Sequence, residues 1–161
     1  MRKLLIDLIL VVFVFSLCGC TPEQNADGRY SAEFAYDPQQ YMLFVNKELQ
    51  APINHISDIL SALGKYKMGE VSEDGLRKLV RSAHSTVSDC FQAIYLMRPP
   101  EHYKEEAERL VGYLDDLKSI YARLIELLDA ESPDKDTIAA MSDSLHESYL
   151  LVTSEANTYW K

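Results

Sequence analysis

The fold of this chain is indicated most clearly by residues 37–67, DPQQYMLFVNKELQAPINHISDILSALGKYK. It opens with Asp37, a residue suited to the N-cap of a helix, and Pro38, which suits the first helical position. Apolar residues then recur at alternating spacings of three and four, the pattern of one helix face. These residues are Met42, Val45, Leu49, Pro52, Ile56, Ile59 and Leu63. The spacing predicts one helix that ends at about Lys67.

Pro52 lies inside this predicted helix. A proline there removes one backbone hydrogen bond and clashes with the carbonyl four residues earlier. Because the apolar stripe keeps its phase on both sides of Pro52, we expect a kink at that point and no second helix.

Three further apolar stripes follow with a similar repeat. Ser72-Glu73-Asp74 predicts the start of the second helix, Arg98-Pro99-Pro100 its end, and Ser132-Pro133-Asp134 separates the third helix from the fourth. The second stripe is Leu76, Val80, Ala83, Val87, Cys90, Ile94 and Met97; the third is Tyr103, Ala107, Leu110, Leu114, Leu117, Tyr121, Leu124 and Leu128; the fourth is Ile138, Met141, Leu145, Tyr149, Val152, Ala156 and Tyr159. Four long helices with short connections predict an all-α fold, an antiparallel up-down-up-down four-helix bundle.

The first twenty residues have a different character. Met1-Arg2-Lys3 is basic, and Leu4 to Leu17 is apolar apart from Asp7 and Ser16, which is the layout of a secretory signal peptide. The uncharged run from Leu8 to Gly19 is shorter than the roughly 20 residues that a spanning helix needs. A signal peptide is therefore favoured over a transmembrane anchor.

Leu17-Cys18-Gly19-Cys20 resembles the lipobox of bacterial lipoproteins. The resemblance implies cleavage before Cys20 and lipidation of its sulfur, with an uncleaved signal anchor as the alternative. Several acyl chains on one cysteine hold a protein stably on a membrane. The resemblance also implies a location on the extracytoplasmic face of the bacterial cell membrane. By analogy with this family, Thr21 after the cysteine favours the outer membrane in a two-membrane cell.

These features predict three parts of the chain. Residues 1–19 form the signal peptide, residues 20–36 the lipidated cysteine and a flexible tether, and residues 37–161 the helical bundle domain. The expected topology places the tether, the turn at 98–100 and residues 159–161 at one pole of the bundle, the terminal pole. The opposite pole contains residues 65–72 and 130–136. We call it the loop pole and expect an envelope protein partner to bind there.

Charge limits the possible partners. The chain has a formal net charge of −9, which becomes −10 when Arg2, Lys3 and Asp7 leave with the signal peptide. Phosphate backbones repel such a surface, so nucleic-acid binding is not expected. The same sign argues against a polybasic membrane contact and leaves the lipid on Cys20 as the anchor.

Processing also removes Cys18, so only Cys90 and Cys20 remain, and because the sulfur of Cys20 carries the lipid no intramolecular disulfide can form. Cys90 lies on the apolar stripe of the second helix, which favours burial as a small apolar side chain. An intermolecular disulfide and a reactive thiol are the alternatives.

No combination of polar residues predicts catalysis, a metal or a cofactor. Asp143 and His146 stand one helical turn apart, but a di-metal centre in a bundle needs carboxylates from all four helices and two Glu-x-x-His pairs. Met42 and His146, the available haem pair, differ in height by about 14 Å along the bundle. The histidines His55, His84 and His102 share no spacing with a nucleophile, and Glu105, Glu106, Glu108, Asp115 and Asp116 fit a solvated face.

Tyrosines are the remaining unusual feature. Four of them lie on the apolar stripes, and we expect these to be core residues with hydroxyls at the rim of the bundle. They are Tyr103, Tyr121, Tyr149 and Tyr159.

The architecture and signal resemble those of small helical lipoproteins of bacteria. The sequence therefore favours a non-enzymatic, membrane-anchored interaction bundle of the cell envelope. A small-ligand or metal-binding module, with its pocket near the kink at Pro52, is the alternative.

Overall fold

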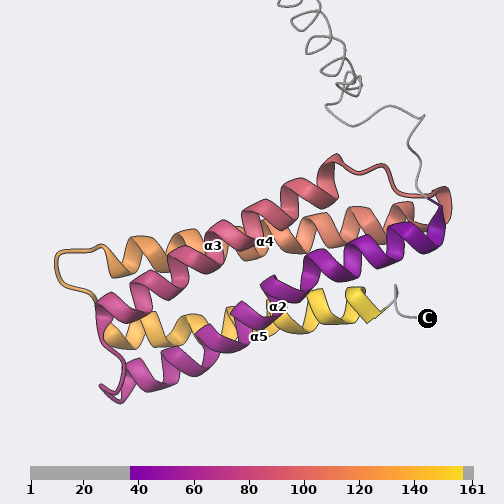
Figure 1. Ribbon diagram of the computed structural model, residues 1–161. Coiled ribbons are helices and arrows are strands. Elements are labelled where there is room, and N and C mark those ends of the chain that lie inside the picture. Colours follow the sequence, from indigo (N-terminus) through magenta and orange to yellow (C-terminus); the bar gives the residue numbers. More distant parts are fainter. Residues whose placement is uncertain (1–36, 158–161) are drawn as a thin grey trace, which may run out of the picture.

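The computed structural model describes residues 37–157. Within that range the chain forms four α-helices, one short 3-10 helix and no β-strand. The elements are α2 (Pro38–Lys67), α3 (Glu73–Leu96), η2 (Glu101–Tyr103), α4 (Lys104–Leu128) and α5 (Lys135–Ala156). Figure 1 shows the four α-helices lying lengthwise beside one another, as in a helical bundle. The predicted all-α class is confirmed for the described residues.

The helix starts follow the predicted caps. The side chain of Asp37 accepts a hydrogen bond from the backbone N–H of Gln39 at 3.1 Å, and Pro38 takes the first helical position. The hydroxyl of Ser72 accepts from the N–H of Gly75 at 3.1 Å and begins α3. Each cap satisfies a backbone donor that has no partner within its own helix.

α2 is one element despite its internal proline. It runs from Pro38 past Pro52 to Lys67 without interruption, so the predicted single helix is confirmed. Pro52 itself is buried. The apolar stripe therefore faces the same core before and after the proline.

Packing pairs define the core. α2 packs against α3 and α5, and α4 packs against the same two helices. The stripe residues fill the space between all four helices, and each large aliphatic side chain buried there contributes about 1.5–3 kcal/mol through the hydrophobic effect. The predicted core residues of α3 and α4 that are buried are Leu76, Val80, Ala83, Val87, Cys90, Ile94, Ala107, Leu110, Leu114, Leu117, Tyr121, Leu124 and Leu128.

The predicted stripes differ from the core at several aromatic and polar positions. Tyr41 is fully buried at the start of α2, where Met42 was expected, and Met42 is only half-buried. Tyr66 is also buried. On α5, the core includes Ser148 and Glu155. A stripe defines the centre of a buried face, whereas the neighbouring helices decide how far the buried face extends to each side.

The expectation for the tyrosine hydroxyls was wrong at one position. The hydroxyl of Tyr121 is buried and has no hydrogen-bond partner within the described residues. Tyr103 and Tyr149 are half-buried and pack against the core. Tyr159 lies outside the described residues.

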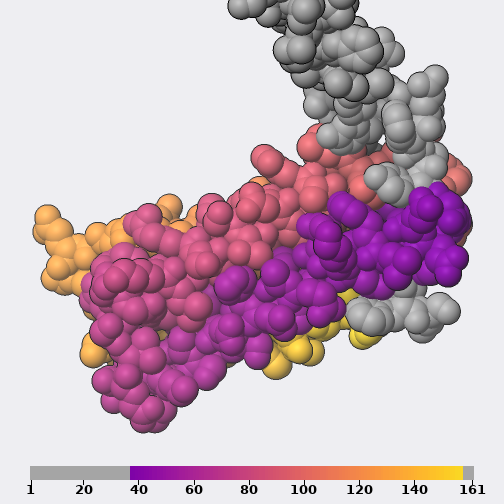
Figure 2. Space-filling view, viewed as in Figure 1, coloured from indigo at the N-terminus to yellow at the C-terminus, as the bar shows by residue number. Residues whose placement is uncertain are grey.

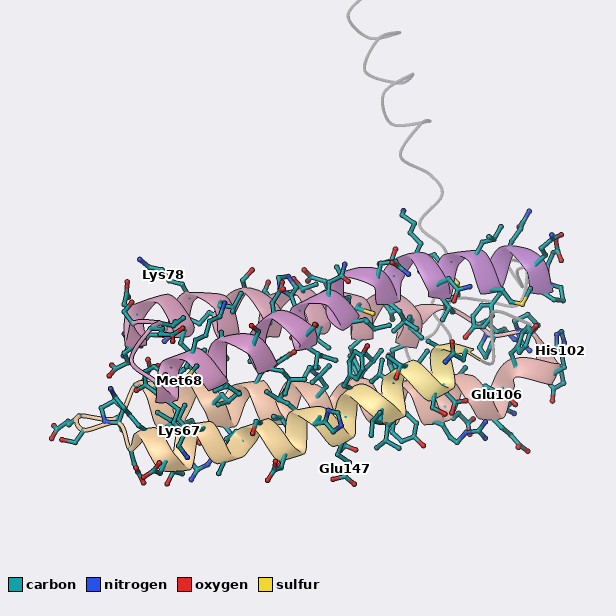
Figure 3. All side chains as sticks on the ribbon, turned by 90° about the horizontal axis from the view of Figure 1, so that it is seen from below. Lys67, Met68, Lys78, His102, Glu106 and Glu147 are labelled. Carbon is teal, nitrogen blue, oxygen red and sulfur yellow. The ribbon has the colours of Figure 1, made fainter. Side chains whose placement is uncertain are left out.

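Contacts between helix ends identify the two poles. At one pole, Lys67 at the end of α2 forms an ion pair with Asp136 at the start of α5. At the other, the hydroxyl of Tyr103 donates to the sulfur of Met42 at 2.9 Å. Figure 3 shows Lys67, Met68 and Lys78 near one end of the molecule and His102 and Glu106 near the other.

Candidate functional site

The structure does not describe the predicted lipidation site. Cys20, the lipobox and residues 20–36 all lie outside the described residues. The site that can be described is the loop pole, where residues 65–72 and 130–136 were expected to lie together.

The structure brings those two loops together. The Nζ atom of Lys67 lies 3.5 Å from a carboxylate oxygen of Asp136, and both side chains are exposed. The Nζ atom of Lys135 also lies 5.4 Å from the ring centroid of Tyr66, a cation–π contact. Side chains from the end of α2 and the start of α5 therefore form one surface.

The loop that follows α2 has a fixed backbone. Gly69 has a φ of 78°, in the left-handed region that favours glycine. The N–H of Glu70 donates to the carbonyl of Lys65 at 2.9 Å and closes the end of the helix. Met68 is 67% exposed beside this turn. A large apolar side chain is thus presented to solvent by an ordered turn.

The loop before α5 is ordered by its own cap. The carboxylate of Asp134 accepts hydrogen bonds from the hydroxyl of Thr137 and the backbone N–H of Asp136. These bonds stabilise the carboxylate and hold the pKa of Asp134 below its ordinary value. Asp134 is therefore an anion at neutral pH on this surface.

Arginines of α3 tie the surface to the end of α4. The Nη2 atom of Arg77 donates to the carbonyl of Leu128 at 2.6 Å, and its Nε lies 3.0 Å from Asp129. Arg81 donates to the other carboxylate oxygen of Asp129 at 2.6 Å. Arg77 thereby supplies a hydrogen-bond donor to the carbonyl of Leu128, which lies at a helix end where no intrahelical donor is available. All four α-helices therefore contribute to the loop pole.

Cys90 is buried, as predicted, with 2% of its surface exposed. Burial raises the pKa of its thiol to about 12, and the negative charge of Glu48 adds to the shift. Because the thiolate is the nucleophilic form, this cysteine is unreactive in the folded protein at neutral pH.

The other polar candidates are dispersed. Asp143 and His146 are exposed on α5, and within residues 37–157 no group of three or more histidine, cysteine or acidic side chains could hold a metal ion. His55 and His84 are half-buried, as expected beside their stripes, and His102 is exposed. On α4 the acidic residues are exposed, except that Glu106 is half-buried and lies 3.6 Å from Arg109.

Two polar features were missed in the sequence. One is the arginine cluster on Asp129, and the other is the pair formed by Arg109 and the buried Glu155. Both join residues more than 40 positions apart, so no local spacing could have revealed them.

None of the helices in residues 37–157 is sufficiently long and apolar to span a bilayer. No family model, curated protein or solved structure matches this chain.

Proposed function

We propose that this protein is a lipid-anchored lipoprotein of the bacterial envelope whose helical domain is a non-enzymatic interaction module. The anchor is the acylated Cys20, on the extracytoplasmic face of the membrane. The interaction surface is the loop pole. The observation that supports this role best is the ion-paired junction of the two loops beside the exposed Met68.

The proposed fold in full is an antiparallel up-down-up-down four-helix bundle with a kink in α2 at Pro52. Its support comes from the helix ends that meet. The end of α2 contacts the start of α5, and the start of α3 contacts the end of α4. The start of α4 contacts the end of α5 through Arg109 and Glu155. Each contact joins the start of one helix to the end of another, as expected for neighbouring helices that run in opposite directions.

The chemistry of the domain fits an interaction role. A well-formed interaction site needs ordered backbone and an exposed apolar side chain with polar groups around it. The loop pole combines Met68 with Lys67, Lys135 and Asp136, which come from two helices. The thiol of Cys90, in contrast, is buried and protonated.

The anchor is tested by blocking lipoprotein processing. Cells expressing the full chain are treated with globomycin, and untreated cells expressing Cys20→Ala are compared with them. Either treatment should leave an unprocessed precursor, and the wild-type protein should acquire a labelled fatty acid that Cys20→Ala does not. Unchanged processing in both cases would show that the lipobox interpretation is wrong. Cys18→Ala is the matched control and should be processed normally.

The interaction surface is tested by site-specific photocrosslinking in intact cells. A photoreactive residue replaces Met68 at the loop pole or Leu150, which is 54% exposed near the end of α5. A crosslinked envelope protein from position 68 and none from position 150 supports the loop pole. The reverse pattern, or no partner from either position, counts against it.

The alternative is a ligand-binding module near Pro52. One observation favours it: the Nδ1 atom of His55, on the next turn of α2, is buried without a hydrogen-bond partner in the described part of the chain. Buried polar atoms are normally paired, so a bound small molecule or metal could supply the missing partner. Metal analysis and an absorption spectrum of the purified full chain, together with native mass spectrometry, test this alternative. It is abandoned if all three show the polypeptide and its lipid alone.

A further inference from the structure

The outer face of α2 is poor in charge. Between Gln39 and Ser61 its exposed side chains are Gln39, Gln40, Leu43, Lys47, Gln50, Ala51, Asn54, Ser57, Asp58 and Ser61. Only two of these are charged. On α4 the exposed positions include Lys104, Glu105, Glu108, Arg109, Asp115, Asp116, Arg123 and Glu126. Depletion of charge is what distinguishes the centre of a protein interface from ordinary surface. In Figure 2 the middle of α2 lies on the visible surface of the molecule.

The two charges on this face are opposite in sign and are unpaired in the part of the chain that the structure describes. Lys47 and Asp58 are exposed, and neither forms an ion pair within residues 37–157. They are separated by eleven positions, or about three helical turns, so they project from the same side of α2 about 16 Å apart. The exposed residues between them are all uncharged.

This arrangement is self-complementary. If a second α2 lies antiparallel against the first, with the two-fold axis beside Pro52 and Ile53, each Lys47 faces the Asp58 of the other copy. The same operation places Ala51 of each copy opposite Asn54 of the other. An interface built on a two-fold axis requires this property, that residue i meets j and j meets i.

We propose that the protein associates with a second copy of itself through the outer face of α2. The two Lys47–Asp58 pairs fix the register, and the short side chains of Ala51, Ser57 and Ser61 let the helices approach closely. Leu43, which is 66% exposed, packs near Ser61 of the other copy. The interface leaves the loop pole free, and it does not depend on the lipid anchor.

Charge reversal tests the register directly. The full chain is purified in a mild detergent, and its association is measured by sedimentation over a range of concentrations. Asp58→Lys and Lys47→Asp should each weaken the dimer roughly tenfold, because each replaces two attractive pairs with two repulsive ones. The double variant, Lys47→Asp with Asp58→Lys, restores both pairs in reverse and should associate like the wild type.

Matched controls come from α4. Asp116→Lys and Lys104→Asp make the same charge changes at exposed positions that have no ion pair in the described structure. Both should leave the dimer unchanged. A monomer at every concentration overturns the proposal, and so does a dimer that both single reversals leave intact. Loss of association in the double variant, with helical content unchanged by circular dichroism, also overturns it.

Discussion

Arg109 of α4 donates two hydrogen bonds to the carboxylate of Glu155 on α5, from Nε at 3.2 Å and from Nη2 at 3.0 Å. Only 8% of Glu155 is exposed. The pair satisfies a carboxylate that packing removes from water, and it joins the beginning of one helix to the end of the next. Hydrogen bonding to Glu155 raises the pKa of Arg109, so the arginine stays charged at any accessible pH.

Removing Arg109 should therefore destabilise the domain more than removing a surface arginine. Arg109→Ala removes this ion pair from a carboxylate that remains buried. Arg123→Ala is the matched control, because Arg123 pairs with Glu126 within α4 and both side chains are mostly exposed. Thermal unfolding of the full chain in detergent should show a clear decrease in Tm for the first variant and almost none for the second. Equal decreases would contradict the structural role of the pair.

Arg77 should stabilise the loop pole through its bond to the carbonyl of Leu128. Arg77→Ala removes that bond and the contact with Asp129, and we expect the free energy of unfolding to decrease by about 1–2 kcal/mol. Lys78→Ala next to it breaks only an exposed pair with Asp74, with an expected effect below about 0.5 kcal/mol. Chemical denaturation of both variants measures the difference. The idea fails if Lys78→Ala proves as costly as Arg77→Ala.

Two glycine-to-alanine substitutions should have opposite effects. Gly69→Ala forces alanine into a φ of 78° and should lower the free energy of unfolding by about 1 kcal/mol. Gly112→Ala, exposed within α4 with no atom near the added methyl group, should raise it by about 0.5–1 kcal/mol. The measurement is again chemical denaturation. If Gly69→Ala were neutral, the turn after α2 would not be held as described.

Tyr121 should tolerate the loss of its hydroxyl group. Because that hydroxyl is buried with no hydrogen-bond partner in residues 37–157, Tyr121→Phe should leave the free energy of unfolding unchanged or raise it by up to about 1 kcal/mol. Tyr121→Ala removes the ring as well and should cost about 3–5 kcal/mol. A substantial loss of stability in Tyr121→Phe would reveal a hydrogen-bond partner, such as an ordered water molecule.

The buried thiol of Cys90 should make stability depend on alkaline pH. The unfolded chain releases this proton above its ordinary pKa of 9.0, whereas the folded protein holds it up to about 12. The stabilising contribution is therefore complete below pH 9 and decreases as pH rises from 9 to 12. The free energy of unfolding, measured by chemical denaturation between pH 8 and 10.5, should decrease more steeply with pH for the wild type than for Cys90→Ala. The same pH dependence in both proteins would show that the thiol has the same pKa in the folded and unfolded states.

Burial should also protect Cys90 from modification. At pH 8 the peptide containing Cys90 should resist iodoacetamide in the native protein and react fully in urea, as measured by mass spectrometry. Rapid labelling of the native protein would mean that the core opens near this residue.

The helices were largely predictable because their signals are local. Asp37 and Ser72 mark helix starts through bonds to their own following turns, and the stripe from Leu76 to Ile94 follows from the geometry of i, i+3 and i+4 neighbours. The same local pattern placed Cys90 in the core. It could not indicate that Tyr41 would be buried in preference to Met42, because Tyr41 lies four and Met42 three positions before Val45, and both spacings fit one helix face.

Within residues 37–157, local sequence patterns predict the four helices, the approximate helix ends and the centre of each buried face, because backbone hydrogen bonding and apolar periodicity act over a few residues. The polar contacts between helices, such as Arg109 with Glu155 and Arg77 with Leu128, become evident only once the helices are packed together. These contacts depend on which helices are neighbours, and the spacing of residues within one helix does not indicate which distant segment packs against it.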